Sequence, residues 1–365
     1  MMIQAKLLEA YSADDFFKLL TETSNPAQSN DYFCNIPWLT SWFKSIDTPP
    51  PLVVFSSNSE VVGLVFLGFI ESKISLFSWK KGLVNQTGIR AYDQPWIEYN
   101  RIYCDPLIEQ ECICSLLDLA STFDVSELVV SMSKRSSLWM RVAAKSWRIE
   151  TEAHFGAKVD LPSTDVTAKH LSRNTRYQIK RAIKAVEVNY GKLSIRKAKT
   201  SSDKKKYFSQ LSAMHIEKWA SSEFGSGFQN PSFNSHLLNL LNEFSHNAEL
   251  VGVFSGETLV GISLNLIADD RVGFYCSGLN YNIADKKIKP GYILHNLMIE
   301  HYREAGKKEY DFLAGYAQYK SSLATDIYSI ETLRLTKRNL RGTIIHILRN
   351  LKQLFFLKLK QKTKK

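Results

Sequence analysis

The sequence predicts an α/β (α+β) protein with two tandem domains, each built on a mixed, mainly antiparallel sheet flanked by helices. Two stretches carry this prediction: FCNIPWLTSWFKSI…LVVFSSNSEVVGLVFLGFIES in the first half and FQNPSFNSHLLNLL…LVGVFSGETLVGISLNLIADD in the second. Each has Phe-x-Asn, a proline, a helical run and two apolar strands joined by a polar turn, and Val-Gly opens the second strand.

The correspondence continues toward the end of each half. Pro106 precedes a helical run and the strand segment SELVVSMSKRSSL, while Pro290 precedes GYILHNLMIEHYREAG and KEYDFLAGYAQYKSSL. Repetition in the same order indicates an internal duplication. We therefore predict a degenerate N-terminal domain at 1–162, a C-terminal domain at 163–340 and a basic amphipathic tail at 341–365. An added helical segment, 167–190, enters the second copy.

The composition is that of a globular protein, with 44% hydrophobic and 23% charged residues. The longest apolar run, 61–70, is shorter than the roughly 20 residues that a bilayer-spanning helix needs. The first residues lack the apolar core of a secretion signal. Five cysteines without a CxxC pair are typical of reduced thiols. We expect a cytoplasmic protein without a metal site.

The net charge of +11 belongs to the end of the chain. Residues 332–365 contain eleven Lys/Arg and no Asp/Glu, and 47 less 11 leaves 36 basic residues against 36 acidic ones elsewhere. A neutral body argues against a large nucleic-acid footprint. In the tail, Ile344, Ile347 and Leu351 follow helical spacing beside basic residues, which favours a helix at an anionic membrane surface. The alternative is a helix docked on the domains.

Several segments together carry a family resemblance: RNTRYQIKRAIK (173–184), MHIEKW (214–219), FYCSGLNYN (274–282), KPGYILHNLMIEHYREAG (289–306) and YDFLAGYAQYK (310–320). The chain resembles GNAT-type acyltransferases of the CelD-like group, which are linked to cellulose and surface-polysaccharide biosynthesis. The tandem arrangement is similar to that of Fem-type aminoacyl transferases. The resemblance covers most of residues 30–335 and implies a cytoplasmic transferase that uses acyl-CoA, with acetyl-CoA the first expectation.

The resemblance also implies a donor site. In GNAT domains the thioester lies between two splayed strands, and its pyrophosphate meets a glycine-rich loop at a helix N-terminus, where free N–H groups and the helix dipole attract anions. The corresponding residues here are Lys289, Pro290, Gly291 and Tyr292. Gly291 alone remains of the glycine pattern, which leaves a donor other than acyl-CoA open.

Four residues are the catalytic candidates. Asp311 places a charge in a strand where the first copy has valine, and either faces substrate or pairs internally with Lys320 or an arginine. Lys320 is a candidate for stabilising an oxyanion. His215 is a candidate base, because its ordinary pKa lies near neutrality, and Tyr275 is a candidate proton donor to the leaving thiolate. Core packing is the alternative for His215 and Tyr275.

The candidates for substrate binding are aromatic and basic. Trp219, Tyr316 and Tyr319 are candidate platforms for a sugar or an aminoacyl group. The basic residues Arg173, Arg176 and Lys180 recur at helical spacing and suit the pyrophosphate of a nucleotide-sugar or a lipid. A solvated helix face is the alternative for this basic stripe.

These observations lead to one leading function and two alternatives. The leading hypothesis is an N-acyltransferase that moves an acyl group from acyl-CoA to an amine on a sugar or lipid-linked sugar, on the inner face of the cytoplasmic membrane, with its cleft in the second copy facing the first. One alternative is Fem-type transfer from aminoacyl-tRNA to a cell-wall precursor. The other is a non-catalytic, membrane-associated assembly factor.

Overall fold

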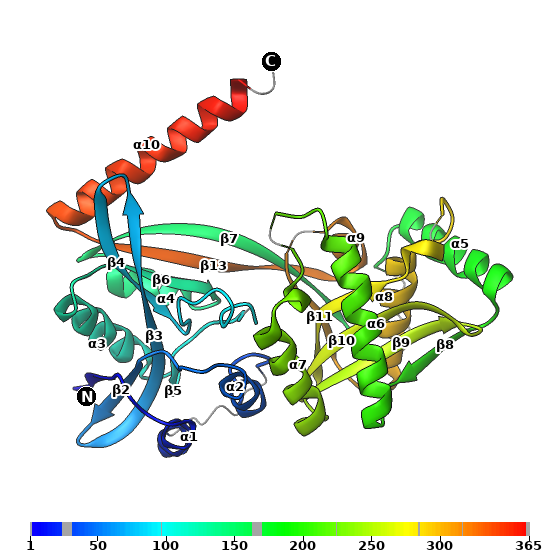
Figure 1. Cartoon of the computed structure of the whole chain (residues 1–365), viewed down its shortest axis with the longest axis horizontal. Helices are drawn as coiled ribbons and strands as arrows, with labels where there is room; N and C mark the ends of the chain where they lie inside the picture. Colours follow the sequence, from blue (N-terminus) through cyan, green and yellow to red (C-terminus); the bar gives the residue numbers. More distant parts are fainter. Residues whose placement is uncertain are drawn as a thin grey trace.

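The computed structural model describes residues 2–23, 31–95, 97–162, 170–223, 225–283, 285–315 and 317–362, with side chains described as far as residue 352. The described residues build a 13-stranded mixed sheet with helices on its faces (Figure 1). Antiparallel pairs outnumber the two parallel ones, β4–β6 and β11–β12. The predicted α/β class with a mixed, mainly antiparallel sheet is confirmed.

The same order of elements occurs twice. The first series is β1 (Gln4–Leu8), α1 (Ala13–Glu22), α2 (Ile36–Phe43), β2 (Leu52–Ser57), β3 (Glu60–Ile74), β4 (Phe77–Val84), α3 (Glu109–Thr122), β6 (Val125–Ser133), α4 (Ser136–Ala143) and β7 (Trp147–Asp160), with the short β5 (Tyr103–Cys104) added. The second is β8 (Leu193–Lys197), α6 (Ser201–Trp219), α7 (Pro231–Glu243), β9 (Ala248–Ser255), β10 (Thr258–Ala268), β11 (Arg271–Leu279), α8 (Pro290–Glu304), β12 (Glu309–Ala314), α9 (Gln318–Leu323) and β13 (Asp326–Lys337). Helix α5 (Arg173–Tyr190) precedes the second series and α10 (Leu340–Lys362) follows it.

The two series, called the first and second repeat below, exchange their last strands. The sheet runs β1-β2-β3-β4-β6-β13-β7-β12-β11-β10-β9-β8, so β13 lies beside β6 and β7 lies beside β12. β7 and β13 also pair with each other, with residues 147–158 opposite residues 326–337. A continuous sheet therefore crosses the boundary predicted after residue 162, and the division into two domains stays a prediction.

The repeats differ where their parallel strands meet. In the second repeat, β11 and β12 pair only from Arg271 opposite Glu309 to Gly273 opposite Asp311, and β11 then continues to Leu279 without that partner. In the first repeat, β4 and β6 stay paired to the last residue of β4, Val84. Among the described strands, only the parallel pair of the second repeat is thus splayed.

The segment after β4 crosses from the first repeat to the second. Asn100 holds it, because its backbone N–H donates to the Met132 carbonyl at 3.0 Å and its Nδ2 donates to the Val84 carbonyl at 3.0 Å. The two residues before Asn100, Glu98 and Tyr99, reach side chains and backbone of β12 and β13. This segment therefore delivers polar groups of the first repeat to the second.

Apolar side chains of the first repeat complete the core of the second. Tyr32, Phe33 and Trp38 are buried in the same cluster as residues of α6, α7 and β10. Helix α2 packs on its counterpart α7, where the Trp38 ring meets the edge of the buried His236 ring with centroids 4.4 Å apart. The two repeats share one core at this contact, in addition to the exchanged strands.

Helix α10 leaves the sheet after its first turns and extends away from the body (Figure 1). Its beginning is docked, because Ile345 is fully buried against the fold. Within the described ranges, none of the helices is long and apolar enough to cross a membrane.

Candidate functional site

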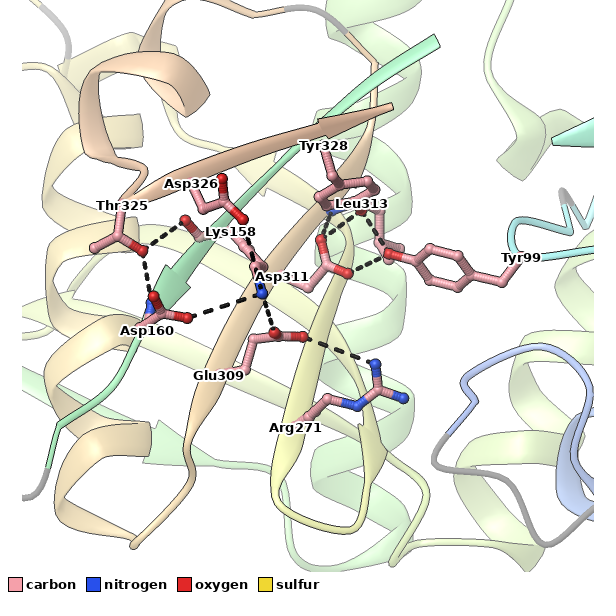
Figure 2. Close-up of polar contacts among 10 residues, drawn as sticks. All are labelled: Tyr99, Lys158, Asp160, Arg271, Glu309, Asp311, Leu313, Thr325, Asp326 and Tyr328. Carbon is pink, nitrogen blue, oxygen red and sulfur yellow. Dashed lines mark hydrogen bonds and ion pairs between the residues drawn. The ribbon is translucent and has the colours of Figure 1, made fainter. Parts of the chain in front are cut away.

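Asp311 lies at the contact between the repeats and is buried, with 1% of its surface exposed. Its carboxylate accepts hydrogen bonds from the Tyr99 hydroxyl, from the Tyr328 hydroxyl at 2.8 Å and from the backbone N–H of Leu313 at 2.8 Å (Figure 2). Burial raises the pKa of Asp311, and the two hydroxyls oppose that rise. These hydrogen bonds come from two tyrosines and one backbone N–H, so the alternative of an internal pair with Lys320 or an arginine is wrong.

Lys134 of the first repeat lies next to Tyr99 and Tyr328, the two tyrosines that bind Asp311. The Lys134 ammonium lies 3.9 Å from the centroid of the Tyr99 ring and 4.4 Å from that of the Tyr328 ring. Such contacts are favourable because the face of an aromatic ring is negative. Lys134, Tyr99, Asp311 and Tyr328 thus form a polar cluster that joins the first repeat to β12 and β13.

A second carboxyl lies nearby, at the edge of a cleft. Glu98 is 6% exposed, and its Oε2 accepts a hydrogen bond from the backbone N–H of Ala314 at 2.8 Å. The cleft has a volume of about 440 Å³ and is lined by Glu98, Met132, Ala153, His154, Phe155, Ala314 and Gly315. Burial raises the pKa of Glu98 to about 7. A carboxyl with this pKa is suited to exchange a proton near neutral pH.

The end of β12 shapes this cleft. The strand has a bulge between Asp311 and Ala314, and Leu313 and Gly315 have φ angles of 58° and 107°. Bulges re-aim the backbone. The Ala314 N–H is consequently directed to Glu98, while the Gly315 N–H donates to the Phe155 carbonyl at 3.1 Å.

Lys320 is engaged with the backbone of β12. Its ammonium donates to the carbonyls of Phe312 at 2.8 Å and Ala314 at 3.0 Å, and lies 3.4 Å from that of Leu313. Burial lowers the pKa of Lys320, and the nearby Glu98 partly offsets this effect. The group holds the bulged strand in place, and the oxyanion role stays a prediction that needs these bonds to rearrange.

His215 and Trp219 lie together at the end of α6. The His215 Nδ1 is 2.8 Å from the Ser226 hydroxyl, and burial lowers the pKa of His215 to about 4. The imidazole is therefore neutral and weakly basic at neutral pH. The Trp219 ring is 45% exposed, with its centroid 6.0 Å from that of His215, and is open to a ligand.

Tyr275 belongs to an aromatic cluster. Its ring contacts Phe33, Trp38 and Phe233, with centroids 6.3, 5.7 and 6.3 Å away. These neighbours come from both repeats, so the ring lies in the core that the repeats share. The packing alternative accounts for its position.

In the predicted donor loop, an aspartate side chain accepts hydrogen bonds from the loop's own backbone. The Asp285 carboxylate accepts the backbone N–H groups of Lys287 and Ile288, each at 2.5 Å. Pro290 begins α8 without an N–H, and Lys289 donates to Gln178 of α5 at 2.7 Å. The side chain of Asp285 thus occupies two backbone amides of the loop that precedes α8.

Gly291 and Tyr292 complete this loop at the start of α8. A Cβ at Gly291 would meet Leu279 at an ordinary 3.4 Å, so the structure shows no close approach that requires glycine. The Tyr292 hydroxyl is 3.1 Å from that of Ser322.

The basic stripe of α5 lines a groove with the loop before α8. The groove has a volume of about 560 Å³ and is lined by Tyr177, Lys180, Arg181, Lys184, Ala185, Val188, Asn189, Asp285 and Lys287. Of the predicted stripe, Lys180 lines the groove, whereas Arg173 and Arg176 are exposed outside it. Four cations against one carboxylate make this groove suitable for phosphate groups.

Tyr319 and Tyr316 are the two remaining aromatic candidates for substrate binding. The Tyr319 ring stacks on the buried His295 ring, with centroids 4.9 Å apart and planes 11° apart. Tyr319 is half-buried and packs against the core. Tyr316 lies outside the described residues.

Sequence reasoning missed Glu98, Tyr99 and Tyr328. Glu98 and Tyr99 lie in IEYN, between the elements of the first repeat and without a counterpart in the second. The segment from the end of β4 to Glu98 contains polar and charged residues, so a further carboxylate there carried no distinct local signal. Their role depends on the contact between the repeats, which the local pattern does not encode.

Comparison with known families finds a match over part of the chain. The model described as acetyltransferase (GNAT) domain matches residues 173–321, from the first residue of α5 into α9. The match includes Asp311 and both sides of the splayed strands. In sequence, this segment is similar to a GNAT-type acetyltransferase domain. No curated protein matches the chain.

Solved structures share the fold over nearly the whole chain. The C-terminal domain of a protein assigned as a lysylphosphatidylglycerol synthetase, from Agrobacterium fabrum, is similar with a TM-score of 0.55 and 10% identity, covering 92% of this chain and 96% of that one. L-PGS from Bacillus licheniformis has a TM-score of 0.53 and 11% identity, covering 93% and 96%. FemX has a TM-score of 0.51 and 10% identity, covering 90% and 96%. At these identities the similarity shows the fold alone.

Proposed function

We propose that this protein is an acyltransferase that acylates an amine in the cleft between its repeats, with Glu98 as the group that accepts the proton. The observation that carries the proposal is the Glu98 carboxyl, whose pKa is raised to about 7 at the edge of a cleft of about 440 Å³. The GNAT-type match over residues 173–321 supports acyl transfer as the chemistry.

The reaction follows from these groups. The amine nitrogen attacks the acyl carbonyl carbon, and a C–N bond forms while the bond from the carbonyl to the donor's sulfur or oxygen breaks. Glu98 accepts the proton that the amine loses, and the leaving atom is protonated from water. Asp311 does not act on the substrate in this scheme, because it is occupied by Tyr99, Tyr328 and Leu313. It is a positioning residue for the segment that carries Glu98.

The leading donor is acyl-CoA, most simply acetyl-CoA. The leading acceptor is an amine on a sugar or lipid-linked sugar. The splayed strands of the second repeat support a thioester donor, since they open where such a donor would pass. The acceptor rests on the resemblance to the CelD-like group and its polysaccharide pathways.

The second candidate is transfer of an aminoacyl group from tRNA to a cell-envelope precursor. It is favoured by the donor loop, where Asp285 already occupies the amides of Lys287 and Ile288. The basic groove along α5 offers lysine and arginine side chains, rather than backbone amides, to the phosphates of a donor. The resemblance to Fem-type aminoacyl transferases supports this candidate, and FemX shares the fold.

The decisive experiment compares donors and removes the proton acceptor. Binding and single-turnover transfer are measured with acetyl-CoA, longer acyl-CoAs and aminoacyl-tRNA, using glucosamine and amino-sugar lipids as acceptors. Glu98→Gln is expected to lower the rate by about 10²–10⁴-fold with unchanged donor binding. In the native protein the rate should rise as pH increases through about 7, because only the deprotonated carboxylate accepts a proton.

Exposed Glu9→Gln is the matched control and should leave the rate unchanged. Full activity of Glu98→Gln would place the proton acceptor elsewhere. Binding of aminoacyl-tRNA without any acyl-CoA would select the second candidate. Failure of every donor to bind would favour the non-catalytic assembly factor.

A further inference from the structure

The beginning of α10 is fixed to the sheet by buried charges. Arg349 donates to Glu150 of β7 at 2.8 Å and to Glu127 of β6 at 2.6 Å, and Glu127 is fully buried. His346 lies 2.9 Å from the same Glu150. Since burying an unpaired carboxylate is costly, these pairs hold α10 in one direction.

From this anchor onward, the helix carries exposed apolar residues and basic residues. Ile347 and Leu351 are 51% and 57% exposed. Figure 1 shows α10 extending clear of the sheet toward the C-terminus. From residue 350 to the end, the sequence holds six lysines, no Asp or Glu, and the apolar run LFFL at 354–357.

The hairpin between β3 and β4 presents a second apolar and basic feature beside α10. Leu76 at its turn is 94% exposed, and none of residues 69–78 is buried. Lys73 and Lys80 flank the turn, and residues 72–80 contain no acid. Figure 1 shows the tip of this hairpin next to α10.

A hydrogen bond joins the two features. Arg341, in the first turn of α10, donates to the Ser78 carbonyl of β4 at 3.1 Å and to Asp124 at 2.7 Å. The hairpin and the helix therefore keep a set position relative to each other. We call residues 72–80 and 347–352 together the hairpin–helix surface, and the sequence that follows residue 352 adds five further lysines.

We propose that the hairpin–helix surface binds an anionic lipid bilayer, with Leu76 entering the headgroup region and the lysines of the tail contacting lipid phosphates. Two features favour a bilayer over a nucleic acid. The arginines Arg341 and Arg349 are paired within the protein, which leaves lysines as the cations of the surface. Exposed aliphatic side chains beside lysines suit the boundary between headgroups and acyl chains, whereas planar guanidinium groups suit nucleic-acid phosphates.

The test measures co-sedimentation of the full chain with phosphatidylcholine vesicles, with and without phosphatidylglycerol. We expect binding only with phosphatidylglycerol, and we expect it to weaken as salt rises, because salt screens exposed charges. Leu76→Asp and Leu351→Asp should each reduce the bound fraction several-fold. Replacing the six tail lysines with glutamine should reduce it by at least about tenfold.

Leu107→Asp is the matched control, because Leu107 is 87% exposed and lies outside the surface. Circular dichroism and thermal melting verify that each variant is folded. Equal binding to both vesicle types, or an equal loss in Leu107→Asp, would overturn the proposal. So would binding to duplex DNA that competes fully with the vesicles, or self-association that depends on Leu351 without lipid.

Discussion

At the residue scale, the two buried carboxyls of the site differ because their hydrogen-bond partners differ. Asp311 accepts from two tyrosine hydroxyls and one backbone N–H, so both of its oxygens are committed. Glu98 accepts from the single Ala314 N–H at the cleft. Burial raises the pKa of each, but of the two carboxyls only Glu98 lines the cleft. This difference assigns proton transfer to Glu98 and positioning to Asp311.

The positioning role of Asp311 predicts a loss of both stability and activity in Asp311→Asn. The amide keeps one acceptor oxygen and turns the other position into a donor, so one tyrosine hydroxyl loses its acceptor. We expect the free energy of unfolding to fall by about 1–3 kcal/mol, since an unsatisfied buried group costs this much. The measurement is chemical denaturation together with the acyl-transfer rate, and Tyr328→Phe is the comparison that removes one of these hydroxyls. An Asn variant with native stability and rate would contradict the role.

At the element scale, the exchanged strands β7 and β13 pack closely against each other beside the cluster of Lys134, Tyr99, Asp311 and Tyr328. Gly156 of β7 lies opposite Tyr328 of β13, and a Cβ at Gly156 would overlap the Tyr328 ring. The ring is held on its other side through its hydroxyl by Asp311. The glycine therefore makes room for a side chain that orients the site.

Gly156→Ala should move the Tyr328 ring away from Asp311. Overpacking of this kind costs about 1–3 kcal/mol, so we expect a lower melting temperature together with slower acyl transfer. Gly291→Ala is the stability control, because its Cβ would meet Leu279 at 3.4 Å. Equal melting temperatures of the two variants would show that β7 yields without strain.

At the scale of the whole molecule, the exchange of strands makes each repeat depend on the other. The first repeat without β13 would leave β6 with an unpaired edge, and the second without β7 would leave β12 in the same state. The core around Tyr32, Phe33 and Trp38 also contains residues of α6 and α7. Separation would expose hydrogen-bonding edges and apolar surface together.

We therefore expect one cooperative unfolding transition for the full chain. Calorimetry should give a single peak whose van't Hoff and calorimetric enthalpies agree, as for a two-state unit. Fragments 1–162 and 163–365, made separately, should lack a cooperative transition and should regain it when refolded together. Two resolved transitions, or a folded fragment alone, would mean that the repeats are independent domains.

Much of this fold could be predicted from the sequence, and the site only in part. The helix–hairpin–helix–strand order follows from local signals such as the asparagine caps, Asn35 and Asn230, and the Val-Gly strand starts. Asp311 was recognised because it breaks the apolar pattern of its strand. Its tyrosine partners were not, because Tyr99 lies 212 residues away and Tyr328 on an exchanged strand.

Spacing along the chain was sufficient to predict the repeated order of elements, their apolar faces and the separation of a neutral body from a basic tail. These properties are local, because the periods of helices and strands appear directly in the order of residues. The exchange of the last strands, by contrast, could be seen only in the folded chain. The same holds for the contacts of Glu98 and Tyr99 with the opposite repeat and for the hydrogen bonds of Lys320 to carbonyls of β12. The physical reason is that pairing between distant segments depends on which edges and cavities the packed repeats leave open, and no local period carries that information.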